Sequence, residues 1–340
     1  MTSSGLCILS PELLAIVFGF LTGESSTLAQ VCLVTHTFNK LATPVLYKCF
    51  RDRRYFTSDE ENPRLFAFLR TVIARPDLAR LVKEVATKSM TDGYYGQLMI
   101  KDDLKASFFR QIDNLSCILF DESLAGGARM RWKKFIEDGD SLSIWALLLC
   151  SLPDIETLFF KTSNEPFLFF NLLGSAASRL KTAQTTNITA SIFCYSELHS
   201  VRTVSSNLQY GYLDFQWFHT FFNLPKIRNF ETALANGEWT DDDESERWDV
   251  VPRSSSIEKL SFQYSAMTGS CITAIINSCA HLQEFHFTYG RNLKTGDHRA
   301  RRWSFRNRQD FTPMQLLQAL LGHADSLEVL HVDYDDDWEK

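Results

Sequence analysis

The chain has 340 residues, more than one average domain, so it can hold a small module beside a sizeable core. Its hydrophobic content of 45% and its 27 phenylalanines exclude wholesale disorder and predict a layered interior filled by large planar side chains. The net charge of -6 does not favour a protein built to coat nucleic acid, whose electrostatic footprint is basic.

The first apolar stretch of the chain has the marks of neither a signal peptide nor a membrane span. It contains Glu12, has no basic leader and is followed by no small-residue cleavage site. It also falls short of the ~20 apolar residues that a span needs. The eight cysteines include no CxxC pair and no histidine at ligand spacing, so we expect reduced, mostly buried thiols without a metal or cofactor. A cytoplasmic or nuclear protein without a membrane contact is predicted.

A first short helix is predicted after residue 10. Ser10 can cap it, Pro11 suits its first position, and Gly23 follows its end. Its apolar residues surround more of the helix than one buried stripe requires. They are Leu13, Leu14, Ile16, Val17, Phe18, Phe20 and Leu21. Because exposing these additional apolar side chains to water is unfavourable, the pattern predicts a protein partner for this helix.

Two further short helical segments follow. The second helix is predicted to start after Ser25 or Ser26, and the third segment carries Phe38 and Leu41 until Thr43–Pro44 breaks it. Three short helices in some forty residues make a poor independent core. Domains this small usually need a staple or a binding partner, and no disulfide or metal pattern is present here.

An ordered series of residues runs through these three segments. It consists of Leu9-Ser10-Pro11-Glu12-Leu13-Leu14, then Ile16, Phe18 and Leu21, then Val31-Cys32-Leu33-Val34, Phe38-Asn39 and Leu41-Ala42-Thr43-Pro44-Val45-Leu46-Tyr47. In this series the chain resembles an F-box, in the form common among fungal F-box proteins. The family's usual Leu-Pro pair is Leu9-Ser10 here, and the proline comes one position later, at Pro11.

The resemblance implies that the segment binds a Skp-type adaptor and, through it, the cullin and RING subunits of a ubiquitin ligase. The residues that it implies as adaptor contacts are Leu9, Pro11, Leu13, Ile16, Leu21, Val31, Val34 and Phe38. The alternative is that these residues are simply the core of an N-terminal helical domain that binds nothing.

The sequence turns polar from Arg51 to Asn62, which predicts a linker at 51–62 between an F-box at 1–50 and a second domain at 63–340. A helical stretch then begins at Pro63. It leads to a first strand candidate around Leu81 to Val85, and Pro76 divides the two. The rest of the second domain continues this alternation of helix and strand.

The strand candidates share the pattern apolar-x-x-apolar-x-apolar. Four clear copies start at Ile155, Ile257, Leu282 and Leu327, and three weaker ones start at Leu180, Leu198 and Ile227. Three of the clear copies, at Ile155, Leu282 and Leu327, follow apolar helical stretches. Spacings between copies run from 18 residues (Leu180 to Leu198) to 45 residues (Leu282 to Leu327), around the roughly 20–29 residues typical of leucine-rich repeats.

The domain therefore resembles an irregular leucine-rich-repeat-like α/β solenoid with a parallel sheet. The pieces ALLLCSLPDIETLFF and FLRTVIARPDLARLVKEV also resemble the region that follows the F-box in many fungal members. An ordinary doubly wound α/β domain is the alternative, because it too alternates helices with strands.

Residues between the apolar strand positions are expected to face away from the core and to line a concave surface. The candidates for target binding are Lys259, Gln263, Glu284, His286, Thr288, His331 and Asp333, together with their neighbours Ser261 and Val329. His286 and His331 are expected to come within reach of each other, either as a metal site or as two solvated or hydrogen-bonded histidines. Tyr264, Tyr289 and Tyr334 are expected to turn inward at the rim of the core, with an aromatic binding ladder as the alternative.

Two charged segments interrupt the repeats, an acidic one at 241–249 and a basic one at 291–308. The basic segment could bind an acidic peptide, a phosphorylated motif or nucleic acid, or be a solvated insertion paired with the acidic one.

No phosphate-cradling glycine loop, nucleophile elbow, HExxH motif or paired-carboxylate pattern stands out, so catalysis is not expected. The predicted function is a non-catalytic substrate receptor of an SCF-type (Skp-cullin-F-box) ubiquitin ligase, with the repeats holding an unknown target protein. The alternatives are an F-box scaffold without ubiquitination output and a nucleic-acid module that uses the basic segment.

Overall fold

The structure is a computed structural model. It describes residues 9–52, 63–87, 100–119, 122–162, 174–175, 198, 200–205, 213–214, 218–233, 235–237, 250–289 and 312–334. The acidic and basic charged segments lie outside these residues, as does the repeat copy expected at Leu180.

The three predicted N-terminal helices are present: α1 (Pro11–Gly19), α2 (Ser25–Cys32) and α3 (His36–Lys48). Ser10 caps α1 as expected, because its hydroxyl accepts a hydrogen bond from the backbone N–H of Leu13 at 3.4 Å. Thr35 caps α3 in the same way through the N–H of Phe38 at 3.1 Å. The helices enclose a small core of their own, formed by Leu14, Phe18, Leu28, Phe38 and Ala42.

The predicted break at Thr43–Pro44 is wrong. The helix α3 continues through Pro44 to Lys48, although proline lacks the N–H that would close the helical turn. Its neighbours pack inward on both sides, with Ala42 fully buried and Val45 partly buried against the small core. Tertiary packing therefore outweighs the local cost of the proline.

The predicted boundary after residue 50 falls inside a strand. Strand β1 (Cys49–Asp52) begins directly after α3 and pairs in parallel with β2 (Glu84–Thr87), so Arg51 and Asp52 belong to the sheet. Phe50 points into the main core and stacks on Phe68 with ring centroids 4.1 Å apart. The rest of the expected linker, residues 53–62, lies outside the described residues.

The second region contains a parallel sheet whose strands follow one another in chain order. Its remaining strands are β3 (Thr157–Thr162), β4 (Ser200–Ser205), β6 (Asn229–Ala233), β8 (Lys259–Met267), β9 (Glu284–Tyr289) and β10 (Val329–Tyr334), and two short strands, β5 (Leu213–Asp214) and β7 (Ala235–Gly237), extend the sheet beside the end of β8. The pairing order is β1-β2-β3-β4-β6-β8-β9-β10. This order never reverses, whereas a doubly wound sheet has a reversal at its switch point.

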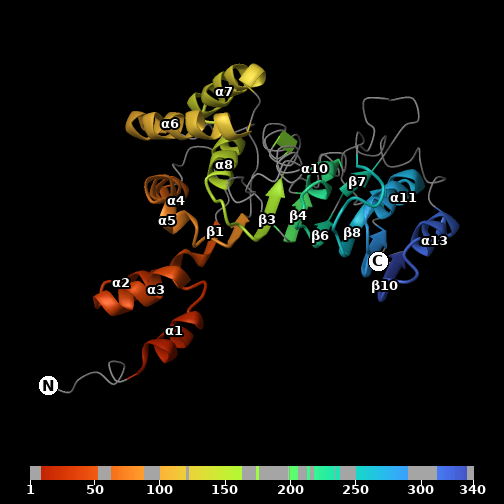
Figure 1. Cartoon of the computed structure of the whole chain (residues 1–340), viewed down its shortest axis with the longest axis horizontal. Helices are drawn as coiled ribbons and strands as arrows, with labels where there is room; N and C mark the ends of the chain where they lie inside the picture. The colour runs from red at the N-terminus through yellow and green to blue at the C-terminus, as the bar shows by residue number, and fades with distance from the viewer. Residues whose placement is uncertain are drawn as a thin grey trace, which may run out of the picture.

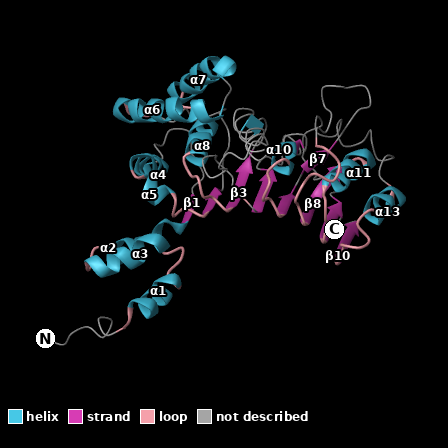
Figure 2. Cartoon of the chain, in the orientation of Figure 1, coloured by secondary structure: helices cyan, strands magenta, loops and turns pink. Residues whose placement is uncertain are grey.

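Helices lie along one side of this row of strands. Figure 1 labels them, and Figure 2 shows the strands side by side with the helices α4, α8, α10 and α11 next to them. The helices described in this region are α4 (Pro63–Ala74), α5 (Pro76–Ala79), α6 (Asp102–Leu119), α7 (Glu122–Glu137), α8 (Ser141–Cys150), α10 (His219–Phe222), α11 (Gly269–Ser278) and α13 (Pro313–Leu321). None of the described helices has the length and apolar character needed to cross a membrane.

Residues at the same register position of most strands are buried to the same extent. The middle apolar position is fully buried in six strands, at Val85, Leu158, Val201, Phe230, Leu260 and Phe285. The weaker copies at Leu198 and Ile227 are confirmed as strands β4 and β6, each preceded by its fully buried first residue. The first strand candidate, expected around Leu81 to Val85, is present as β2, Glu84–Thr87. Val82 and Val85 occupy the apolar positions of the repeat there, with Thr87 in place of the last apolar residue.

The same pair of backbone hydrogen bonds opens four of the copies. The carbonyl of Lys83 accepts the backbone N–H groups of both Glu156, at 2.8 Å, and Thr157, at 2.9 Å. This paired arrangement recurs with the acceptors Arg228, Glu258 and Gln283 and the donor pairs Glu258 and Lys259, Gln283 and Glu284, and Glu328 and Val329. The repeat thus exists in backbone geometry as well as in sequence.

Candidate protein-interaction surfaces

One candidate surface lies on the N-terminal helices, where large apolar side chains face solvent. It is defined by Leu13, Ile16, Val17, Phe20, Leu33 and Val34, which are 50%, 57%, 39%, 84%, 86% and 62% exposed, and is called the apolar patch below. Helix α1 and its C-cap residue Phe20 supply four of the six, because within the helix only Leu14 and Phe18 turn toward the small core. Burying one such side chain fully is worth about 1.5–3 kcal/mol, so covering the patch would release substantial free energy.

The predicted adaptor contacts divide into three groups by burial. Pro11, Leu13, Ile16 and Val34 are exposed, while Leu9, Leu21 and Val31 are half-buried against the small core. Phe38 is buried, and its ring lies edge-on to that of Phe18 at 5.4 Å. Phe38 therefore packs within the small core, and its expected adaptor contact stays a prediction.

Sequence reasoning left three residues of the apolar patch, Val17, Phe20 and Leu33, out of the contact set. Phe20 follows Leu13 and Ile16 at helical spacing, so its place on the same face was available from periodicity. Val17 lies beside them on α1, and Leu33 follows the last residue of α2. Only the packing of α2 against α3 decides that Leu33 stays outside the small core.

A second candidate surface is the side of the sheet that faces away from the main core, called the open face below. The register aligns its residues into rows that cross the strands. One row contains Lys259, Glu284 and Val329, and the next contains Ser261, His286 and His331. All of the predicted target-binding residues are on this face and partly or well exposed, which confirms the expected alternation.

Ion pairs between neighbouring strands hold many charges of the open face and its edge. Lys83 Nζ lies 3.2 Å from Glu156 Oε1, and Lys259 Nζ lies 2.5 Å from Glu284 Oε1. The hydrogen bond from Lys259 to Glu284 also raises the pKa of the lysine. Such exposed ion pairs contribute little to the stability of a fold. They do give each of these charged groups a partner of opposite charge.

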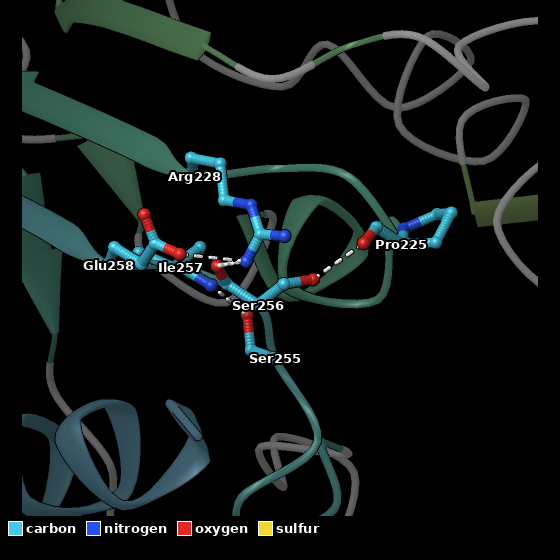
Figure 3. Close-up of polar contacts among 6 residues, drawn as sticks. All are labelled: Pro225, Arg228, Ser255, Ser256, Ile257 and Glu258. Atoms are coloured by element: carbon cyan, nitrogen blue, oxygen red, sulfur yellow. Dashed lines mark hydrogen bonds and ion pairs between the residues drawn. The ribbon is translucent and has the colours of Figure 1, made fainter. Parts of the chain in front are cut away.

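Figure 3 shows how one of these pairs belongs to a turn network at the start of β8. Arg228 Nη1 donates to the Ser256 carbonyl at 3.2 Å and pairs with Glu258 Oε1 at 2.9 Å. The Ser256 hydroxyl donates to the Pro225 carbonyl at 2.6 Å. These bonds join the turn that precedes β6 to the turn that precedes β8 and so help to fix the register of the open face.

The two histidines come together as expected. The ring centroids of His286 and His331 are 5.9 Å apart, and Glu284 Oε2 lies 3.9 Å from His286 Nε2. Within the described ranges no group of three or more histidine, cysteine, aspartate or glutamate side chains is arranged to hold a metal ion. Two neighbouring histidines beside a glutamate are therefore the arrangement that the structure contains.

The expectation for Tyr264 is wrong. A bulge in β8 places Gln263 and Tyr264 opposite the single residue Thr288, so Ser265, and not Tyr264, pairs with Tyr289. Tyr264 has a positive φ of 49° and is 39% exposed, whereas Tyr289 packs against the main core as predicted. The side chain of Tyr334 lies outside the described set.

The described cysteines are free thiols, as expected. Cys150, Cys271 and Cys279 are buried, and Cys32 and Cys49 are half-buried. Burial raises the pKa of Cys49 to about 11, so this thiol stays protonated at neutral pH.

A scan against protein-family models and a search of curated proteins found no match for this chain. The fold shown is an α/β fold with a parallel open sheet, preceded by a small helical cluster.

Proposed function

We propose that this chain is the non-catalytic substrate-recognition subunit of an SCF-type ubiquitin ligase. In this proposal residues 11–48 form an F-box that binds a Skp-type adaptor, and the sheet region is an irregular leucine-rich-repeat-like solenoid that holds a target protein. The adaptor links the chain to cullin and RING subunits, which bring the ubiquitin-conjugating enzyme. Tethering then raises the effective concentration of a target lysine near that enzyme.

The observation that carries the proposal is the apolar patch on its own small core. Five buried residues hold the N-terminal helices together, while six large apolar side chains remain in water. Exposed patches of this kind mark protein contacts. Four of the six patch residues, Leu13, Ile16, Leu33 and Val34, belong to the ordered series that resembles an F-box.

The repeat in strand order, burial and backbone hydrogen bonds supports the solenoid part of the proposal. Each unit covers its apolar face only against the next unit, which is the physical basis of solenoid stability. The open face then offers a continuous row of strands to a target, with polar side chains from several strands available for specificity.

The test is co-expression of the full chain with a Skp-type adaptor. We expect the two to co-purify, and Ile16→Asp to weaken the complex by about 100-fold or more because an unpaired charge would be buried in the contact. Met130→Asp is the matched control, since Met130 is 72% exposed on α7, apart from the patch. A well-folded wild-type chain that ignores the adaptor would overturn the proposal.

A second measurement separates a ligase receptor from a scaffold without ubiquitination output. Proteins captured by the chain in cells are quantified in the presence of wild type and of Ile16→Asp. A receptor predicts that a captured target accumulates with the variant, because it is bound but no longer delivered. Unchanged amounts of every captured protein would favour the scaffold.

A further inference from the structure

A small cavity lies where the N-terminal helices meet the first strand of the sheet. Its volume is about 100 Å³. Ser25 and Leu28 line it from α2, Cys49 and Arg51 from β1, and Arg64 from α4. Because one water molecule occupies about 30 Å³ in the liquid, the cavity has room for roughly three waters or one small tetrahedral anion.

Two guanidinium groups converge on this cavity, and they differ in how their charge is balanced. Arg51 Nη2 is paired with Glu84 Oε1 at 2.9 Å. For Arg64, no carboxylate lies within ion-pair distance in the part of the chain that the structure describes. Its Nη2 lies 3.5 Å from the Ser25 hydroxyl oxygen, and its guanidinium carbon lies 6.0 Å from the centroid of the Phe50 ring.

We propose that this cavity binds a phosphate-class oxyanion, held by Arg64 and Arg51 beside Ser25. The guanidinium group is suited to this ligand, because its planar array of donors matches the oxygens of a phosphate. Leu28, Val45 and Leu46 supply the apolar part of the lining.

The oxyanion can come from two sources. One is free inorganic phosphate. The other is a phosphoryl group on Ser25 itself, which a protein kinase would transfer from a nucleoside triphosphate. In that transfer a bond forms between the Ser25 oxygen and the terminal phosphorus, the bond from that phosphorus to the diphosphate breaks, and the hydroxyl proton passes to the base of the kinase.

Occupancy would tie together three elements that belong to two regions. Helix α2 carries part of the N-terminal core, while β1 and α4 belong to the sheet region. An anion between them would fix the orientation of the apolar patch relative to the open face. This inference goes beyond the proposed function, because it concerns how the two regions are held and does not depend on which partners they bind.

The first experiment titrates the unphosphorylated full chain with inorganic phosphate and follows the thermal midpoint, with chloride keeping the ionic strength constant. A saturable rise is expected in wild type and its loss in Arg64→Ala. Arg64→Lys keeps the positive charge but cannot form bidentate hydrogen bonds, so phosphate should raise its thermal midpoint by less. Arg75→Ala is the control, because Arg75 is an exposed arginine that pairs with Asp77 at 2.6 Å and does not line the cavity.

The second experiment installs phosphoserine at position 25 of the full chain. A raised midpoint that Arg64→Ala abolishes, with no further gain from added phosphate, would assign the site to the covalent phosphoryl group. A gain from inorganic phosphate alone would assign it to the free anion. The proposal is overturned if neither form stabilises the chain, or if the stabilisation is the same in Arg64→Ala as in wild type.

Discussion

The apolar patch and the open face are both solvent-exposed. They differ in whether their side chains form polar contacts with one another. On the open face, Lys259 and Glu284 pair across strands, and His286 lies against its neighbours. On the patch, Phe20 and Leu33 are each more than four-fifths exposed. A surface whose groups satisfy one another is stable in water by itself, whereas a surface of large apolar groups gains free energy only when something covers it.

The largest expected effect separates the two faces of helix α1. Phe18→Ala should destabilise the N-terminal helices by about 3–5 kcal/mol, because it opens a cavity in a core of few residues. Phe20→Ala should change stability by no more than about 0.5 kcal/mol, because its ring is already in water. Hydrogen exchange of α1 to α3 measures both, and equal losses would contradict the division of the helix into a buried and a free face.

A second contrast tests the repeat within the sheet. Leu260 and Leu330 occupy the same register position, on β8 and β10, yet Leu260 is fully buried and Leu330 is 53% exposed. Leu260→Ala should cost about 2–5 kcal/mol of unfolding free energy, and Leu330→Ala less than half as much. Denaturant unfolding of the two variants makes the comparison. Equal costs would mean that the β10 end of the sheet is covered in solution.

Acid should weaken the sheet region through His323, which is 2% exposed. Its Nδ1 accepts the N–H of Leu282 at 3.3 Å, so its Nε2 carries the proton donated to the Ile276 carbonyl at 3.0 Å. Burial lowers the pKa of this imidazole, and the charge of Arg253 lowers it further. Folding therefore disfavours the protonated form.

The sign of the pH effect follows from this lowered pKa. The unfolded chain binds the proton near its ordinary pKa of about 6.5, so stability is retained above that value and falls as pH drops toward the folded pKa. Unfolding midpoints at about pH 7.5 and about pH 5.5 should differ more in wild type than in His323→Gln. An equal difference in both would show that His323 is not the group responsible.

The smallest effect is expected on the open face. Lys259→Met removes the pair with Glu284, and the thermal midpoint should change by less than about 2 °C because both groups remain hydrated. Capture of a target should change more than stability does, if this face is the contact. A large loss of stability with unchanged target capture would contradict the proposal that the charged residues of the open face serve binding and contribute little to stability.

Local signals predicted much of this fold. Ser10 and Pro11 correctly predicted the start of α1, because helix capping depends only on residues within one turn. The pattern that begins at Ile257 predicted a strand, its inward residues and its open-face residues, because alternation in a strand has a fixed period of two. Pairing of His286 with His331 followed from the shared phase of two copies.

The failures lie where distant segments decide. Nothing near Pro44 indicates that α3 continues, since the compensation comes from packing against α1 and α2. The strand at Arg51 exists because β2 supplies its partner from more than thirty residues away. The bulge at Tyr264 is a property of the pairing between β8 and β9, so neither strand shows it alone.

The sequence by itself determined which residues are apolar, where most helices and strands begin, and that strand copies share one phase. These depend on short-range periodicity and capping. Only the tertiary structure decided that Phe38 is inside and Leu33 outside, that the first strand continues α3, and that Arg64 and Ser25 meet at a cavity. Each of these depends on which surface is left after distant segments have packed, and a linear pattern does not contain that information.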